Sequence, residues 1–441
     1  IVPPEYLETL LSLPENQFAF HGLNKIEASG SVEGFYILSR QYSPITRFQD
    51  LDRRLAEKKL AFFEAMQLAA GNLFFREAGI CIRTNKKLLL VEDGGYLAPQ
   101  LNALSLEKKS VRDAMIYYGF DPGKKNEGLK EILPVSDKDL EKPLGEWLSA
   151  FFTGSVEHTR NGYDRLVGVQ KKYNRLQFPA LTIAVSKTKR EMESREVSVS
   201  ILHAVESILH GQGLVLSNRR ALVLGSRGAI GQCLVQHLKS RIQPDRVAGV
   251  DLVINSKNSS AQGITEAAAL EKLGKEHVRD ADIILGVIGK SIFTDEWIED
   301  LILNGKRPHV FFASGSTKTL EFTHLSHYVE KLRQAQSPRI RGQAARVDAE
   351  PIRDPQTGLI QGTQVRIELD KKTRTLHLLG GLTPINFLYY GVPTETMDPV
   401  LTQLIQSAAG LLARQKSGKG LPPRVLAVDH EITVDAELIK K

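Results

Sequence analysis

Three glycines and one aspartate form the clearest candidate site in the sequence. Gly225, Gly228 and Gly231 lie in the stretch GSRGAIG, between an apolar run typical of a strand and a helical pattern. A dinucleotide pyrophosphate needs backbone that it can approach closely, at a helix N-terminus whose N–H groups and dipole favour anions. Asp251 lies at the end of the next predicted strand, 20 residues after Gly231, where a carboxylate binds the ribose hydroxyls of NAD and repels the additional phosphate of NADP. The pattern predicts NAD as the cofactor.

Two features of this turn leave alternatives open. The spacing departs from G-x-G-x-x-G, because Ser226 occupies the first position and Gly225 lies one residue earlier. A structural strand-to-helix turn is the simpler alternative, and Arg227 is a residue type that would suit NADP. The cofactor-binding residues predicted from this part of the chain are Gly225, Ser226, Arg227, Gly228, Ala229, Ile230, Gly231 and Asp251.

The elements around the turn predict a parallel sheet. Apolar runs typical of buried strands lie at 220–225, 246–253, 281–289 and 308–315. A helical pattern at 229–241 follows the first of them, and this alternation is typical of βαβ units. Two alternating segments within 363–381 predict a β-hairpin. The stretch 397–415 predicts an amphipathic helix with one apolar face, made of Leu401, Leu404, Ile405 and Ala408.

The preceding residues predict a second α/β domain. Helices are expected at 50–79 and 146–154, and strands at 87–98 and 177–185. The predicted fold class is α/β, with a Rossmann-type NAD-binding domain at 196–385 and a substrate domain made of 1–195 and completed by 386–441. The chain would cross between the domains twice, and we expect the active site in the cleft between them.

Composition excludes several classes of protein. The chain of 441 residues is 42% apolar and 25% charged, with apolar runs too short to cross a bilayer. Its net charge of +7 comes from scattered Lys and Arg pairs with no basic stripe, so neither nucleic acid nor membrane is predicted as a partner. Cys81 and Cys233 form no disulfide framework or zinc spacing, and no metal site is predicted. We expect a cytoplasmic protein that binds a small-molecule substrate.

Six segments of the chain resemble S-adenosylhomocysteine hydrolases, in the same order as in that family. They read LLLVEDGGYL, SVEHTRNGYDRL, QFPALTIAVSKTK, RRALVLGSRGAIGQ, ADIILGVIGKSIFTDEWI and HLLGGLTPINFLYYGVPTETMDPVLTQLIQSAAGLL, and cover about 85–415. The resemblance implies a bound NAD that oxidises the 3′-hydroxyl of a nucleoside, after which the 5′ substituent is eliminated, water adds and the ketone is reduced again. It also implies a homo-oligomer, a dimer or tetramer.

The resemblance implies roles for individual residues. Lys189 falls on the catalytic lysine of the family, and Asp93 falls on an aspartate of its acidic-glycine turn. His158 aligns with a catalytic glutamate, with Glu157 one position before it, and Glu193 occupies the place of an aspartate. These five are the predicted catalytic residues, although a solvated lysine and an ordinary turn aspartate are simpler readings of the first two. The resemblance adds four cofactor contacts, namely Thr159, Ile288, Gly289 and Asn386.

The chain also departs from the family pattern. Ser194 replaces an asparagine, Ser316 replaces a catalytic histidine, and Tyr96 replaces an aspartate of the acidic turn. The sequence therefore predicts an NAD-dependent enzyme that oxidises a secondary hydroxyl of a nucleoside-like or polyol substrate other than adenosylhomocysteine. Two alternatives remain: an NAD-binding pseudoenzyme that regulates a protein partner, and a plain NAD-dependent dehydrogenase.

Overall fold

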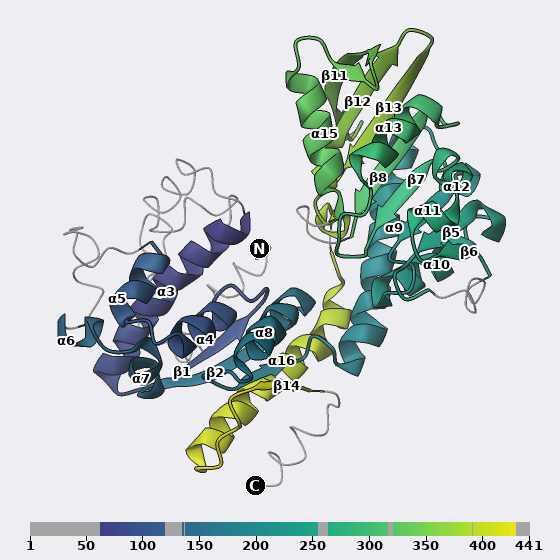
Figure 1. Ribbon diagram of the computed structural model, residues 1–441. Helices are drawn as coiled ribbons and strands as arrows, with labels where there is room; N and C mark the ends of the chain where they lie inside the picture. The colour runs from purple at the N-terminus through teal and green to yellow at the C-terminus, as the bar shows by residue number, and fades with distance from the viewer. Residues whose placement is uncertain are drawn as a thin grey trace. The chain divides into compact units, whose positions relative to one another are not determined.

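The chain folds as two compact units (Figure 1). The computed structural model describes residues 62–119, 135, 137–254, 263–315, 321–389 and 391–428. Unit 1 comprises Ile1–Ser186 and Gln403–Lys441, and unit 2 comprises Lys187–Thr402. The division differs from the predicted changes of domain at 195 and 385, and it places Lys189, Glu193 and Asn386 in unit 2 with the glycine turn.

Unit 1 contains a parallel sheet of four strands in the order β1-β2-β3-β14. The strands are β1 (Leu88–Glu92), β2 (Phe152–Glu157), β3 (Ala180–Thr182) and β14 (Val425–Ala427). The helices are α3 (Phe62–Thr84), α4 (Ala98–Leu106), α5 (Val111–Tyr117), α6 (Asp137–Leu140), α7 (Leu144–Ser149) and α8 (Arg160–Tyr173). An aromatic core holds helices and sheet together: Phe75 stacks on Trp147, and Phe152 meets Phe74 and Phe178 edge to face.

Unit 2 contains a sheet of eight strands in the order β11-β12-β13-β8-β7-β4-β5-β6. From β6 to β13 all neighbours are parallel, and β12 and β11 extend the sheet as antiparallel strands. The six parallel strands follow the order 3-2-1-4-5-6, which defines a Rossmann fold. Their bounds are β4 (Ala221–Leu224), β5 (Val247–Val250), β6 (Thr265–Ala267), β7 (Ile283–Gly286), β8 (His309–Ser314) and β13 (Lys372–Leu379), with β12 (Ile360–Leu369) and β11 (Arg346–Arg353) beyond.

Both faces of this sheet are buried. In β4, Leu222 and Leu224 belong to one apolar cluster, and Ala221 and Val223 belong to another. Successive residues of a strand point to opposite faces, so the continuous apolar run predicted at 220–225 is explained by helices on both sides. One face is covered by α9 (Ser194–Gly211) and α10 (Ala229–Lys239), and the other by α11 (Leu270–Leu273), α12 (Lys275–Arg279), α13 (Asp295–Asn304) and α15 (Thr323–Gln334).

The remaining elements are short, apart from one long helix. Two-residue strands β9 (Arg339–Ile340) and β10 (Gln343–Ala344) pair with each other. Short helical turns are η2 (Lys189–Glu193), η3 (Leu216–Asn218), η4 (Pro244–Arg246), η5 (Gly380–Leu382) and η6 (Ile385–Phe387). The long helix α16 (Thr394–Lys416) crosses the division between the units.

Most predicted elements are confirmed, including the α/β class, the parallel strands and the hairpin β12–β13. The helix predicted at 146–154 is wrong in its second half, because α7 ends at Ser149 and β2 begins at Phe152. Every residue of β2 is buried, including the polar Thr153, Ser155 and Glu157, so burial in this strand does not follow residue type. The part of the predicted helix at 50–79 that precedes residue 62 lies outside the described residues.

The predicted apolar face of α16 is buried only in part, at Leu404 and, less completely, at Ala408. Ile405 is 68% exposed and Leu401 is 41% exposed, whereas Val400, Leu404 and Leu411 are buried. The buried side also includes the polar Gln403 and Ser407, which shifts it away from the face that apolar residues alone indicate.

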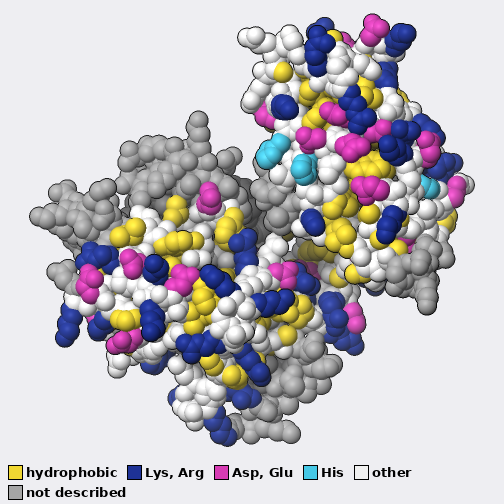
Figure 2. All heavy atoms as spheres, viewed as in Figure 1, with side chains coloured by type: hydrophobic (Ala, Val, Ile, Leu, Met, Phe, Trp, Pro, Cys, Tyr) yellow, Lys and Arg dark blue, Asp and Glu magenta, His cyan; other side chains and the backbone are white. Residues whose placement is uncertain are grey.

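Charges on the visible face of unit 2 are mixed. Figure 2 shows Lys and Arg side chains interspersed with Asp and Glu side chains there, and no basic stripe runs across this face. Within the described ranges, no helix has both the length and the apolar character required to span a membrane.

Candidate functional site

The first glycine of the turn makes the sharp change of direction after β4. Gly225 has a φ of 97°, and a Cβ atom there would lie 2.7 Å from the backbone nitrogen of Ile288. Its N–H donates to the Val250 carbonyl oxygen at 2.7 Å. The turn therefore lies between the ends of β5 and β7, where the strand order of the sheet reverses.

The other two glycines set the position of α10. A Cβ atom at Gly231 would lie 1.8 Å from the Gly225 carbonyl oxygen, so only glycine allows this helix to pack so close to the turn. At Gly228, the N-cap of α10, a Cβ atom would meet Gly225 O at 3.5 Å, which is ordinary contact. No side chain of the described residues caps this end of the helix. Tight turn, open approach and close helix packing are the three glycine functions of a dinucleotide site.

Asp251 closes the turn from the neighbouring strand. Its Oδ2 accepts a hydrogen bond from the Arg227 backbone N–H at 2.9 Å, and its Oδ1 accepts from the Val253 N–H at 3.2 Å. The side chain follows β5 directly, at the carboxyl edge of the sheet where a ribose is bound in Rossmann folds.

A second carboxylate, which the sequence did not reveal, lies beside Asp251. Glu266 on β6 accepts a hydrogen bond from Ser226 Oγ at 2.7 Å and another from Arg227 Nε at 3.0 Å. Arg227 Nη2 also pairs with the second oxygen of Glu266. The side chain of Glu266 is fully buried, and that of Arg227 is 16% exposed. An acidic residue inside the short stretch ITEAAA was the available signal.

The loop after β7 completes this edge of the sheet. Gly289, with a φ of 71°, donates its N–H to Oε1 of the buried Glu321. Ile288 precedes it and forms the wall against which Gly225 turns. Both residues therefore adjoin the glycine turn.

Asn386 has a buried amide oxygen and lies near the end of β8. It lies in η6, the short turn that begins directly after Pro384, and Pro384 bridges to Ser314 at the end of β8. The side chain is buried, and its Oδ1 has no hydrogen-bond partner among the residues that the structure describes. A buried unpaired amide oxygen costs free energy, and a ligand N–H would satisfy it.

Lys189 and Glu193 form an ion pair in a π-helical turn. Lys189 Nζ lies 2.9 Å from Glu193 Oε2, and the two side chains are 11% and 17% exposed. The turn, η2, packs against α9 and α10, and α9 packs against η6, which carries Asn386. These packing contacts explain why both residues belong to unit 2 rather than to the preceding domain. A π-turn within a helix is frequent at functional sites.

Two buried carboxyl groups lie side by side in unit 1. Glu92 and Glu157 are register partners at the ends of β1 and β2. Glu92 accepts backbone hydrogen bonds from Leu97 and Ala98, while Glu157 Oε1 accepts from Gly94 and Thr159. Burial, followed by the neighbouring Glu157, raises the pKa of Glu92 to about 8, and burial likewise raises the pKa of Glu157.

The predicted catalytic residues of unit 1 surround this pair. Asp93 Oδ1 lies 3.4 Å from His158 Nδ1, and the Asp93 side chain is 75% exposed whereas that of His158 is 12% exposed. Thr159 is the N-cap of α8, where its Oγ1 accepts from the Gly162 N–H and donates to Glu157. Glu157 itself is fully buried; its Oε1 holds the two loops, and its Oε2 has no hydrogen-bond partner among the described residues.

The structure thus gathers the predicted residues into two groups. In unit 1 they are Asp93, Glu157, His158 and Thr159. In unit 2 they are Lys189, Glu193, Gly225, Ser226, Arg227, Gly228, Ala229, Ile230, Gly231, Asp251, Ile288, Gly289 and Asn386.

The similarity of this chain to known proteins is weak. No protein-family model matches the sequence, and neither does any curated protein. A 2-hydroxyacid dehydrogenase from Ketogulonicigenium vulgare Y25 is similar, with a TM-score of 0.38 and 12% identity over 78% of this chain and 100% of that one. One chain of the dipicolinate synthase from Bacillus halodurans has a TM-score of 0.29 and 17% identity over 42% of this chain.

A third similar structure is D-lactate dehydrogenase from Aquifex aeolicus, complexed with NAD and lactic acid, with a TM-score of 0.28 and 13% identity over 40% of this chain. The match spans 58% of the dipicolinate synthase chain and 60% of the lactate dehydrogenase. The strand order of unit 2 therefore remains the basis for its assignment as a Rossmann fold.

Proposed function

We propose that unit 2 binds NAD and that the protein is an NAD-dependent oxidoreductase acting on a hydroxyl group. The proposal rests on Gly225, Gly228 and Gly231, each of which has a different steric role at the point where the strand order of the sheet reverses. A merely structural strand-to-helix turn has no need of an open helix N-terminus beside an acidic residue at the end of the second strand.

The residues present fit each part of this cofactor. The N-terminus of α10 offers backbone N–H groups and a favourable dipole to the pyrophosphate. Asp251 lies where the adenosine ribose hydroxyls would bind. Asn386 Oδ1, buried and unpaired among the described residues, would accept a hydrogen bond from the nicotinamide carboxamide.

Bound NAD supplies the hydride acceptor for oxidation of a carbon that carries a hydroxyl group. The chain must then take the hydroxyl proton, and Lys189 is the group that we assign to this step. Lys189 Nζ would take this proton, and Glu193, whose Oε2 lies 2.9 Å from it, would hold the ammonium ion. The π-turn that places both residues packs against α10, the helix of the glycine turn.

A narrower form of the proposal is transient oxidation, as the resemblance to adenosylhomocysteinases implies. The substrate would be a nucleoside-like or polyol compound, and the ketone would be reduced again before release. Retention of Lys189 and Asn386 in one unit with the glycine turn supports this form. Net oxidation releases NADH to the solvent, whereas a transient oxidation leaves only enzyme-bound NADH, so the two forms are distinguishable by absorbance of the filtrate.

The test is a screen of nucleosides, sugar alcohols and 2-hydroxy acids with the full chain and added NAD, followed by absorbance of NADH. We expect Lys189→Ala to lower the rate of substrate-driven reduction by about 10²–10⁴-fold, the usual contribution of a general base. Lys187→Ala is the matched control, because Lys187 lies on the same segment, is 63% exposed and has its own glutamate partner, Glu191, at 3.9 Å.

Three results would overturn parts of the proposal. Failure to bind NAD would remove the cofactor and the activity together. Binding of NAD without any substrate-driven reduction would favour an NAD-binding regulator over an enzyme. Equal rates for the Lys189→Ala and Lys187→Ala variants would exclude Lys189 as the base.

A further inference from the structure

We propose that Glu266 determines the preference for NAD over NADP, by holding the Arg227 guanidinium away from the ribose. This inference rests on the proposed cofactor site of unit 2. Sequence patterns assign cofactor preference to the acid at the end of the second strand, which is Asp251 here. The structure adds a second carboxylate, on the third strand, that engages the arginine of the glycine turn.

The geometry ties Arg227 to Glu266 at several points. Arg227 Nε donates to Glu266 Oε1 at 3.0 Å, and Nη2 pairs with the other carboxylate oxygen, so the contact is bidentate. Ser226 Oγ donates to the same Oε1 at 2.7 Å, which fixes the carboxylate beneath the turn. Bidentate arginine–carboxylate contacts are geometrically specific and are strong when buried.

The backbone of Arg227 lies beside the carboxylate of Asp251. The Arg227 N–H donates to Asp251 Oδ2 at 2.9 Å, so Arg227 leaves the turn beside the carboxylate proposed to bind the ribose. A guanidinium released at this place would be in reach of a 2′-phosphate, which arginine recognises by the same bidentate geometry that it uses for carboxylates.

Charge balance then favours NAD. Arg227 contributes one positive charge, and Asp251 and Glu266 contribute two negative charges at the end of the adenosine ribose. A 2′-phosphate would add a dianion to a site that is already negative, whereas the ribose hydroxyls of NAD donate to a carboxylate. Neutralising Glu266 would remove one negative charge and, with it, the charged partner of the guanidinium.

The test compares the dissociation constants of NAD and NADP for the wild type and for Glu266→Gln by titration calorimetry. We expect the wild type to bind NAD at least about tenfold more tightly than NADP, and Glu266→Gln to shift the ratio toward NADP by about tenfold or more. In the double variant Arg227→Gln with Glu266→Gln, the gain in NADP binding should disappear, because the shift acts through the guanidinium.

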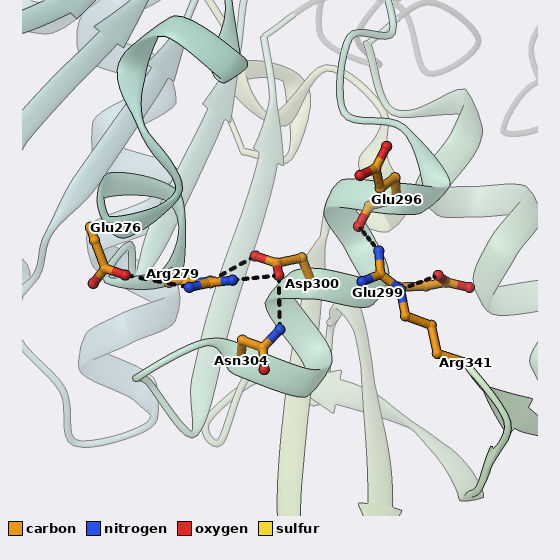
Figure 3. Close-up of polar contacts among 7 residues, drawn as sticks. All are labelled: Glu276, Arg279, Glu296, Glu299, Asp300, Asn304 and Arg341. Carbon is orange, nitrogen blue, oxygen red and sulfur yellow. Dashed lines mark hydrogen bonds and ion pairs between the residues drawn. The ribbon is translucent and has the colours of Figure 1, made fainter.

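A matched control is available elsewhere in unit 2. Asp300 is a buried carboxylate on α13 that receives two hydrogen bonds of 2.8 Å from Arg279 on α12, as Figure 3 shows. Asn304 donates to the same carboxylate. Asp300→Asn therefore removes a buried, arginine-paired charge at a distance from the glycine turn, and we expect the NAD to NADP ratio to stay as in the wild type.

The outcomes separate this inference from the proposed function. No binding of either dinucleotide to the wild type would overturn the proposed function and this inference with it. Binding of NAD with an unchanged ratio in Glu266→Gln would overturn this inference alone, as would an equal shift in Asp300→Asn. Should Glu266→Gln fail to fold, the wild type still decides, because equal affinity for NAD and NADP would contradict the role of Glu266.

Discussion

The two units place polar groups at the same position, the carboxyl ends of parallel strands, but these groups have different partners in each unit. In unit 2 these groups surround an open helix N-terminus and leave the Asn386 oxygen unpaired within the described residues, as a site that binds a ligand would. In unit 1 three of the four carboxyl oxygens of Glu92 and Glu157 accept hydrogen bonds from the backbone of their own loops, and Glu157 Oε2 has no partner among the described residues.

The difference teaches that polar residues at a strand end are not by themselves a binding site. Glu157 aligns next to a catalytic residue of a known family, yet it is fully buried and serves Gly94 and Thr159. A site requires a backbone that a ligand can approach as well as chemistry, and in unit 2 Gly228 offers this approach at the N-cap of α10.

The largest effect should follow from Gly231→Ala in unit 2. The new Cβ would lie 1.8 Å from the Gly225 carbonyl oxygen, so α10 must move away from the turn. We expect a loss of about 3 kcal/mol in the free energy of unfolding and loss of NAD binding. Gly168→Ala in α8 is the control, since nothing lies within 4 Å of its Cβ position. It should stabilise unit 1 by roughly 0.5–1 kcal/mol, and equal destabilisation of both variants would contradict the account.

Stability of the two units should respond to pH in opposite directions. In unit 1, Glu92 keeps its proton up to a pKa of about 8, well above its ordinary value of 4.5. The unfolded chain loses that proton first, so the free energy of unfolding falls as pH rises from about 4.5 to about 8. The change is on the order of a few kcal/mol.

In unit 2, burial and the adjacent His309 lower the pKa of His377 from 6.5 to about 4. The unfolded chain binds the proton first, so the free energy of unfolding falls as pH decreases from about 6.5 to about 4. His377→Gln should flatten this dependence in unit 2 and leave unit 1 unaffected.

Tryptophan fluorescence can follow each unit separately. The chain has two tryptophans, Trp147 in unit 1 and Trp297 in unit 2. Urea unfolding of Trp297→Phe reports unit 1, and unfolding of Trp147→Phe reports unit 2. Parallel pH profiles in the two variants would contradict the opposite roles of Glu92 and His377.

The smallest effect should come from Thr159→Ala at the start of α8. The variant loses the N-cap hydrogen bond from Gly162 and the donation to Glu157. We expect a loss of about 1 kcal/mol in the free energy of unfolding of unit 1, measured in the Trp297→Phe background. A loss several times larger would mean that Thr159 also fixes the geometry of the two carboxyl groups.

Features that depend on residues close together in the chain could be predicted from the sequence. Gly225, Gly228 and Gly231 fall within one strand-to-helix turn, and their order reflects the three steric requirements of that turn. The continuous apolar runs of β4, β7 and β8 likewise predicted buried strands of a parallel sheet, and the structure buries them on both faces.

Features that depend on contacts between strands could not be predicted from the sequence. Glu266 meets Arg227 across 39 positions, and Glu92 meets Glu157 only through the register of β1 and β2. Strand β2 itself was missed; it buries the polar Thr153, Ser155 and Glu157, whose burial depends on the neighbouring strands and not on residue type. The division between the units was displaced because η2 and η6 pack with α9 and α10, which their own sequences do not show.

The central claim is that unit 2 holds NAD at the glycine turn. Its most direct test is to denature freshly purified protein, identify any released nucleotide by mass and absorbance, and then titrate stripped, refolded protein with NAD. The account predicts one NAD per chain, either released or bound on titration, and no binding by Gly231→Ala. Absence of released nucleotide together with no binding of added NAD would show that GSRGAIG is only a turn, and the oxidoreductase proposal would be wrong.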